Sequence, residues 1–244
     1  MGSIRRTGIA FLSAALLASA VVGSAAAGDT ATYRVTIVNL THGQPFTPPL
    51  IAVHRNSVDV FTVGQPASFG VKEIAENGNL MPLRLTLEAT KGVAAVAAAG
   101  APVVPIGSPG QTMHGFSNIL TMMITAPQDV RRISWVSMLI CTNDGFTGVD
   151  GLRLPHDVGE TVADFTAGYD AGTEINTEAF ADIVPPCQGL IGVSGAAGTG
   201  MSNPALAEGG VIHHHPGIIG GTNLSQAVHG WTDPVALIAI ERIS

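Results

Sequence analysis

The chain has 244 residues, of which 12% are charged, 30 are glycine and 15 are proline. Asp and Glu outnumber Lys and Arg by 18 to 11, and the formal net charge of -7 argues against nucleic acids and anionic membranes as partners. This length suits one large β domain or two small ones, and the many turn-forming residues favour an all-β architecture.

Residues 1–27 have the pattern of a signal peptide. Arg5 and Arg6 give a positive start, an apolar run follows over residues 9–22, and three alanines before Gly28 provide a small-residue cleavage site. The apolar run is shorter than the about 20 residues that a membrane-spanning helix needs. We therefore expect an exported protein, periplasmic or extracellular, without membrane insertion, whose mature part is one domain over residues 28–244.

Six segments have the alternating or apolar pattern of β-strands. The predicted strands are 32–40, 81–89, 116–125, 133–141, 162–167 and 235–243. One helix is predicted over residues 67–77, because Pro66-Ala67-Ser68 opens it and Asn77-Gly78 closes it. Residues 92–110 are expected to connect elements, with one short apolar strand or helix among them. Together these elements predict an all-β antiparallel sandwich with one short helix.

Acidic side chains and glycines gather in residues 141–176. Asp144 and Asp150 are each followed by glycine, and a second acidic turn runs from Asp170 to Glu174. Calcium prefers such an environment of oxygen ligands. The spacing is not that of an EF-hand. Two interpretations stay open: a calcium site, or two solvated turns whose Asp and Gly residues serve turn geometry alone.

Cys141 and Cys187 are the only cysteines. In an exported protein an even pair favours a disulfide, and this one would tie the end of a central strand to a later loop. The alternative is a buried free Cys141 beside an exposed Cys187. The spacing matches no zinc-thiolate pattern.

A histidine triplet gives a second candidate metal site. If this segment is extended, His213 and His215 share one face, and two imidazoles at that spacing can chelate zinc or copper. His54 or His114 could complete such a site. The triplet also suits a Gly-rich surface loop without any metal.

Catalytic motifs are missing from the sequence. It has no Gly-x-Ser-x-Gly, no His-Glu-x-x-His, no phosphate-binding loop and no dinucleotide fingerprint. Asp144 and Asp150 could pair as acid and base in a glycosidase, but aromatic residues to line a sugar cleft are scarce. We therefore expect a protein that is not an enzyme.

Several motifs together resemble the spondin amino-terminal domain of F-spondin and mindin. They are TNDGFTGVDGLRLP (142–155), YDAGTEIN (169–176), ISWVSMLIC (133–141) and the block TPPLIAVHRNSVDVFTVGQPASFGVKEIAENGN (47–79). The resemblance covers most of the mature chain, and the alanine-rich composition favours a bacterial exported member.

This resemblance implies a C2-like β-sandwich with a metal at one end. Carried over by position, it implies calcium ligands at Asp144, Asp150 and Asp170, with Glu174 as a further contributor. It also implies an extracellular module for adhesion or recognition, whose partner is a cell-surface or extracellular protein or glycan of unknown identity. The alternative function is a zinc- or copper-binding protein or metalloenzyme that uses His213 and His215.

Overall fold

Two antiparallel β-sheets pack face to face in the computed structural model, which describes residues 29–244. The predicted signal peptide lies outside the described residues. The four-stranded sheet has the order β4 (Ile119–Pro127), β1 (Thr30–Asn39), β10 (Ala236–Arg242), β7 (Thr161–Thr166). The six-stranded sheet has the order β3 (Val93–Ala98), β2 (Leu50–His54), β5 (Arg132–Met138), β6 (Gly145–Arg153), β8 (Gly168–Asp170), β9 (His213–His214). The prediction of an all-β antiparallel sandwich is confirmed.

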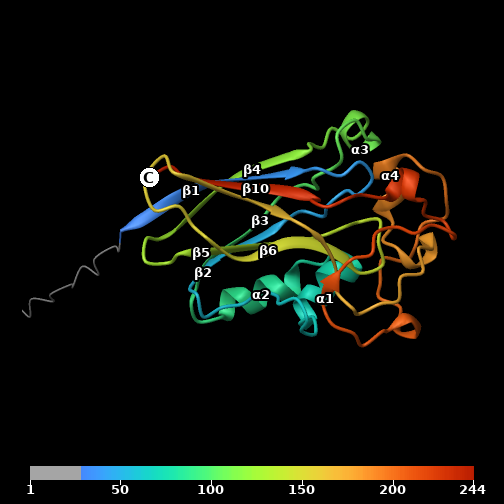
Figure 1. Cartoon of the computed structure of the whole chain (residues 1–244), viewed down its shortest axis with the longest axis horizontal. Coiled ribbons are helices and arrows are strands. Elements are labelled where there is room, and N and C mark those ends of the chain that lie inside the picture. The colour runs from blue at the N-terminus through green and yellow to red at the C-terminus, as the bar shows by residue number, and fades with distance from the viewer. Residues whose placement is uncertain (1–28) are drawn as a thin grey trace, which may run out of the picture.

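The six-stranded sheet is covered on both faces, so the molecule has two hydrophobic cores. Ile51, Val53 and Trp135 face the four-stranded sheet and pack against its apolar residues. Leu50 and Met138, on the same two strands, point the other way and pack with residues of two helices. Figure 1 shows these helices, α1 (Phe69–Asn77) and α2 (Met81–Ala89), on the outer side of this sheet.

The predicted helix over residues 67–77 is confirmed as α1. The Ser68 side chain accepts a hydrogen bond from the Val71 N–H at its start, and Gly78 ends it with a φ of 65°. Shorter helical segments are α3 (Pro109–Thr112), α4 (Pro186–Ile191), α5 (Gln226–His229) and two 3₁₀ turns, Phe180–Asp182 and Pro204–Leu206. No helix among residues 29–244 has the length and apolar character to cross a membrane.

The predicted strand over residues 81–89 is wrong, because this segment forms helix α2. Its leucines alternate with polar residues, but Leu83 and Leu87, one helical turn apart, are buried whereas Leu85 is 57% exposed. This is the period of an amphipathic helix. The fold therefore has a second full helix beside the single one that was expected.

The other five predicted strands are confirmed as β1, β4, β5, β7 and β10, and β3 lies in the predicted connecting segment. Four strands, β2, β6 and the short β8 and β9, were not predicted from the sequence. All five residues of β2 are buried, so it has no alternating pattern. β6 contains four glycine or aspartate residues, which are typical of turns and disfavoured in strands. Its Gly148 lies so close to the Trp135 carbonyl that a Cβ would approach the oxygen to 2.1 Å.

The predicted disulfide joins Cys141 to Cys187, which settles the alternative of two free thiols. Both cysteines are fully buried, and the bond connects the loop after β5 to helix α4. Closing a loop with a sequence separation of 46 stabilises the fold by about 4 kcal/mol in the chain-entropy description. The bridge thus fixes the chain three residues before Asp144.

Candidate metal centre

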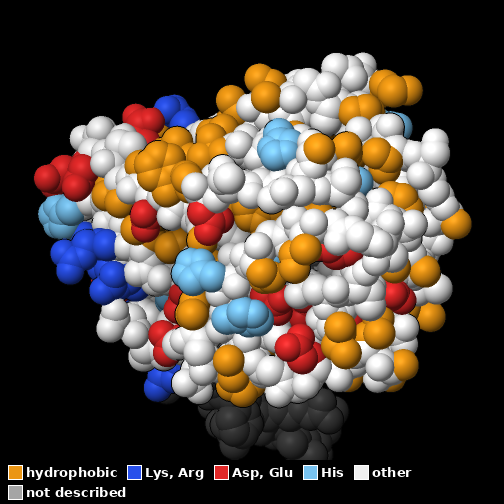
Figure 2. Space-filling model, turned by 45° about the vertical axis from the view of Figure 1, so that its right-hand side comes forward, with side chains coloured by type: hydrophobic (Ala, Val, Ile, Leu, Met, Phe, Trp, Pro, Cys, Tyr) orange, Lys and Arg blue, Asp and Glu red, His pale blue; other side chains and the backbone are white. Residues whose placement is uncertain are grey.

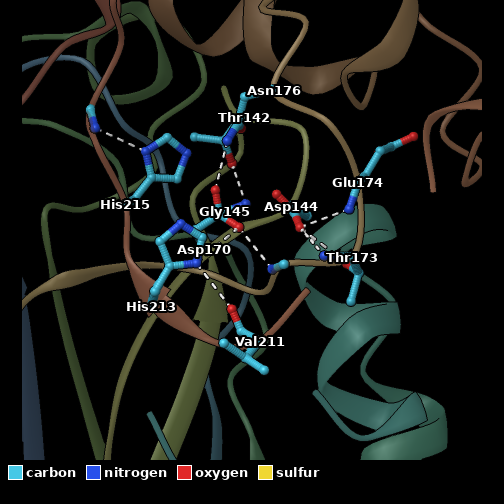
Figure 3. Close-up of polar contacts among 12 residues, drawn as sticks. Thr142, Asp144, Gly145, Asp170, Thr173, Glu174, Asn176, Val211, His213 and His215 are labelled. Carbon is cyan, nitrogen blue, oxygen red and sulfur yellow. Dashed lines mark hydrogen bonds and ion pairs between the residues drawn. The ribbon is translucent and has the colours of Figure 1, made fainter. Parts of the chain in front are cut away.

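The candidate site lies at the end of the six-stranded sheet where β6 begins. Asp144 precedes β6 directly, and Asp170 ends β8, where it pairs with Gly145 on one side and His213 on the other. Antiparallel pairing of β6, β8 and β9 thus brings together residues that lie up to 69 positions apart in the sequence. Figure 3 shows Asp144, Asp170 and the two imidazoles of His213 and His215 in one group.

Asp144 is fully buried, and its two carboxylate oxygens have unequal surroundings. Oδ2 accepts hydrogen bonds from the Thr173 N–H at 2.7 Å, the Thr173 hydroxyl at 3.1 Å and the Glu174 N–H at 3.0 Å. Oδ1 has no hydrogen-bond partner among the residues that the structure describes. A buried carboxylate oxygen without a donor is costly, so Oδ1 is an atom to which a cation could bind.

Asp170 is 1% exposed, and a tight turn satisfies both of its oxygens. Oδ1 accepts from the Gly172 N–H at 2.7 Å, and Oδ2 accepts from the Asn176 amide at 2.6 Å. Gly172 has a φ of 67°, and a Cβ there would lie 2.6 Å from Val211 backbone atoms, so only glycine fits. Each Asp170 oxygen keeps one lone pair for a further interaction.

Burial and the second carboxylate both disfavour the charge on Asp144. Burial is the larger cause and Asp170 the next, and together they raise the pKa of Asp144 from 3.8 to about 6, against the opposing effect of its three hydrogen bonds. Two carboxylates that share a buried site, with one oxygen unpaired, are the arrangement that a bound cation would stabilise.

Glu174 contributes to the site through its backbone and directs its carboxylate elsewhere. Its N–H donates to Asp144, while its Oε1 accepts from the Asn203 N–H at 3.1 Å. Figure 3 shows the side chain pointing away from Asp144. Burial raises the pKa of Glu174 to about 7.

Asp150 lies apart from this group, within β6. At about 3.3 Å per residue, it is about 17 Å along the strand from Gly145, too far to share an ion with Asp144. Its Oδ1 accepts from the Val60 N–H at 2.9 Å and from the Ser134 hydroxyl at 2.7 Å. The same hydroxyl lies 2.6 Å from Nε2 of His54, which is fully buried.

The histidine triplet does reach the site. Nδ1 of His213 lies 3.9 Å from Oδ1 of Asp170, and its ring is half exposed. His215 is buried, and burial lowers its pKa to about 4. Its Nδ1 accepts from the Gly217 N–H, so the neutral ring carries its proton on Nε2, which has no partner among the described residues. His54 belongs to the Asp150 network, and His114 stacks on Phe116.

Thr173, which donates to Asp144, and Asn176, which donates to Asp170, were not predicted as site residues, although both stand in the YDAGTEIN motif. Nor was Glu178, whose carboxylate accepts hydrogen bonds from the Ile219 and Gly220 N–H groups at 2.7 Å. Nothing in the local sequence marks Glu178, because its partners follow about 40 residues later. Across residues 29–244, no group of three or more His, Cys, Asp or Glu side chains is arranged to hold a metal ion.

Comparison with protein families gives one match. The Spondin_N family, the spondin amino-terminal domain, matches residues 39–181. That range includes β2 to β8 and both Asp144 and Asp170, and it ends before Cys187 and the histidine triplet. A search of curated proteins finds no significant match. Since the match covers more than half of the chain, the protein belongs to the spondin amino-terminal domain family.

Proposed function

We propose that this protein is an exported, calcium-binding β-sandwich module that serves adhesion or recognition and has no catalytic activity. Membership of the spondin family supports an extracellular module of the adhesion type. The partner is an extracellular or cell-surface protein or glycan. The calcium site consists of Asp144 and Asp170, completed by backbone carbonyl and water oxygens.

The unpaired Oδ1 of Asp144 carries this proposal. The atom is buried beside a second buried carboxylate, and the three donors around Asp144 all serve the other oxygen. A cation would satisfy Oδ1 and offset the repulsion between the two charges. Calcium suits the site because it takes six to eight oxygen ligands, including carbonyls and water, in flexible geometry.

Calcium here would be structural. Asp144 belongs to the loop between β5 and β6, and Asp170 is the last residue of β8, where the next turn begins. An ion between them would join two loops at one end of the sandwich, on a surface that also contains the exposed His213 and His214. We expect this surface to bind its partner only when calcium is present.

Thermal unfolding of the mature protein, residues 28–244, tests the calcium site. At about 100 times its dissociation constant, calcium adds about 2.7 kcal/mol to the free energy of unfolding. We expect the midpoint to rise by about 5–10 °C over the value in EDTA. The variant Asp144→Asn keeps an acceptor for its three donors but removes the charge, and we expect it to lose this shift.

The control variant is Asp164→Asn, which removes the same charge from an exposed position on β7. It should keep the full calcium shift. The proposal is wrong if wild-type protein shows no calcium shift, or if both variants lose it to the same extent.

A second candidate is a zinc or copper site at His213, whose ring lies near Asp170. Nδ1 of this ring donates to the Val211 carbonyl at 3.0 Å, so Nε2 would be the metal-binding atom. The bond from Gly217 to Nδ1 of His215 opposes this candidate, because the proton on Nε2 of His215 must leave before that atom can bind a metal. A zinc-induced midpoint shift that is lost in both His213→Ala and His215→Ala would support this candidate over calcium.

A further inference from the structure

A pocket of about 530 Å³ opens at the other end of the β5–β6 hairpin. It lies where β5 starts and β6 ends, about 25 Å along these strands from the calcium site. Its lining residues are Arg55, Asn56, Asp129, Arg131, Arg132, Arg153, Leu154 and His156. The volume is typical of sites for small-molecule ligands.

The pocket concentrates positive charge in an acidic protein. Lys and Arg total 11 in the chain, and two of them, Arg5 and Arg6, precede the described residues. Four of the remaining nine line this one pocket. In Figure 2, all Lys and Arg side chains in view lie on the left-hand side, whereas Asp, Glu and His side chains also occupy the centre.

The arginines of the pocket exceed the acids that could neutralise them. Arg55 forms an ion pair with Asp129, the only acidic residue in the lining. Arg132 is held in place by hydrogen bonds to Asn56 and to the Gly151 carbonyl. Arg131 and Arg153 make no side-chain hydrogen bond or ion pair with any residue from 29 to 244. Just outside the lining, Asp157 contacts His156, and the Glu160 carboxylate accepts from two backbone N–H groups.

The strand register adds a second indication. Arg132 and Arg153 stand directly opposite each other on β5 and β6. Like charges in this position destabilise a pair of strands, and Arg131 adds a third charge beside them. An anion between the guanidinium groups would turn this repulsion into attraction.

We propose that this pocket binds a tetrahedral oxyanion, a phosphate or sulfate ester carried on a sugar-sized molecule. The planar guanidinium group binds such oxyanions through two parallel N–H···O bonds, and Arg131 and Arg153 both have these donors free. Three arginines without an acidic partner match the three terminal oxygens of a phosphate or sulfate ester better than the two oxygens of a carboxylate. The pocket also has more room than an inorganic ion needs, so the rest of the ligand contributes contacts. This site shares no residue with the calcium centre and does not depend on it.

Isothermal titration of the mature protein in EDTA, with glucose 6-phosphate and glucose 6-sulfate as probes, tests the proposal. Inorganic phosphate, inorganic sulfate and unmodified glucose serve as comparison ligands. We expect at least one ester to bind. The double variant Arg131→Gln/Arg153→Gln should weaken its binding by about tenfold or more, because the loss of a single charge-assisted hydrogen bond already raises a dissociation constant by about that factor.

The matched control is Arg34→Gln/Arg84→Gln, which removes two exposed arginines that form ion pairs on β1 and α2. It should bind the ester like wild-type protein. Equal weakening by both double variants would show a general charge effect and overturn the site. The site is also overturned if neither ester binds at millimolar concentration. If the inorganic ion binds as tightly as its ester, the assignment to an ester is overturned.

Discussion

At the scale of single residues, the folded protein without calcium disfavours the charged form of Asp144. Its pKa is about 6 in the folded protein and 3.8 ordinarily, so between these values the folded state binds more protons than the unfolded chain. The free energy of unfolding should therefore rise as the pH falls from about 6 to 4. The change amounts to about 3 kcal/mol, because each unit of difference between the folded and unfolded pKa contributes about 1.4 kcal/mol.

Chemical denaturation in EDTA at several pH values measures this effect, and Asp144→Asn isolates it. The variant is needed because other groups titrate nearby. Glu174 has a raised pKa and acts in the same direction as Asp144, whereas the lowered pKa of His215 removes stability below about 6.5. The contribution of His215 cancels in the difference between wild type and variant, and that of Glu174 cancels except for the minor part that the charge of Asp144 itself causes. A difference that stays constant from pH 7 to pH 4 would contradict the pKa of Asp144.

Asp150 has a structural role, in contrast to Asp144. Its carboxylate takes hydrogen bonds from the Val60 N–H and from Ser134, both of which are buried. Asp150→Ala leaves the Val60 N–H without a partner and removes one partner of the Ser134 hydroxyl, which keeps its contact with Nε2 of His54. We expect this loss to cost about 2 kcal/mol and to lower the unfolding midpoint by about 4–8 °C. We expect the calcium-induced shift to remain in this variant.

Asp164→Ala is the control for that measurement, since Asp164 is exposed and, among residues 29–244, its side chain accepts a hydrogen bond from the N–H of the next residue alone. Its effect should stay within about 0.5 kcal/mol. Loss of the calcium shift in Asp150→Ala, with the fold intact by circular dichroism, would place Asp150 in the metal site after all.

At the scale of elements, the sequence predicts strands with one solvated face and the long apolar run of β5, but it does not reveal the short buried strand β2. β1 and β10 alternate cleanly and were predicted, whereas β2 is buried on both faces and shows no period. In α2, the alternation of leucine with polar residues fits the period of a strand, and the helix is favoured only by packing against α1 and β3.

The candidate site shows the same limit. Asp144 and Asp170 stand in motifs that the spondin resemblance identified, and the structure brings them together. Asp150 stands in the same motif as Asp144, but sequence spacing alone does not show that most of strand β6 separates them. Partners such as Glu178 and Gly220 meet only through long-range packing, which no local pattern encodes.

Close contact between α1 and α2 gives a prediction at this scale. A Cβ on Gly70 would lie 2.7 Å from Cα of Leu83, in a contact that backbone atoms cannot relieve. Gly70→Ala should therefore destabilise the protein by about 1–3 kcal/mol, although alanine is the better helix former. Thermal unfolding measures the change.

Gly189→Ala in α4 is the matched substitution, because a Cβ there meets no atom within 4 Å. It should raise the free energy of unfolding by up to about 1 kcal/mol. If both substitutions stabilise the protein, the two helices are farther apart than described.

At the scale of the whole molecule, the family match is smaller than the folding unit. It covers residues 39–181, whereas β1 and β10 form the two central strands of the four-stranded sheet and lie almost wholly outside it. Val35, Ile37, Ile238 and Ile240 on these strands are fully buried. At about 1.5–3 kcal/mol each, they account for at least about 6 kcal/mol of burial, against a total stability of about 5–15 kcal/mol for a typical domain.

A fragment of residues 39–181 should therefore not fold, whereas residues 29–244 should unfold in one cooperative transition by circular dichroism. Removal of β1 and β10 also leaves β4 and β7 with unpaired edges, which promotes aggregation. The fragment also lacks Cys187, so its failure to fold could come from loss of the disulfide or from loss of the central strands. A longer fragment, residues 29–234, separates these two causes because it keeps the disulfide and lacks only β10. We expect this longer fragment to lose its cooperative transition as well. Cooperative unfolding of both fragments near the wild-type midpoint would show that the matched region folds without its two central strands.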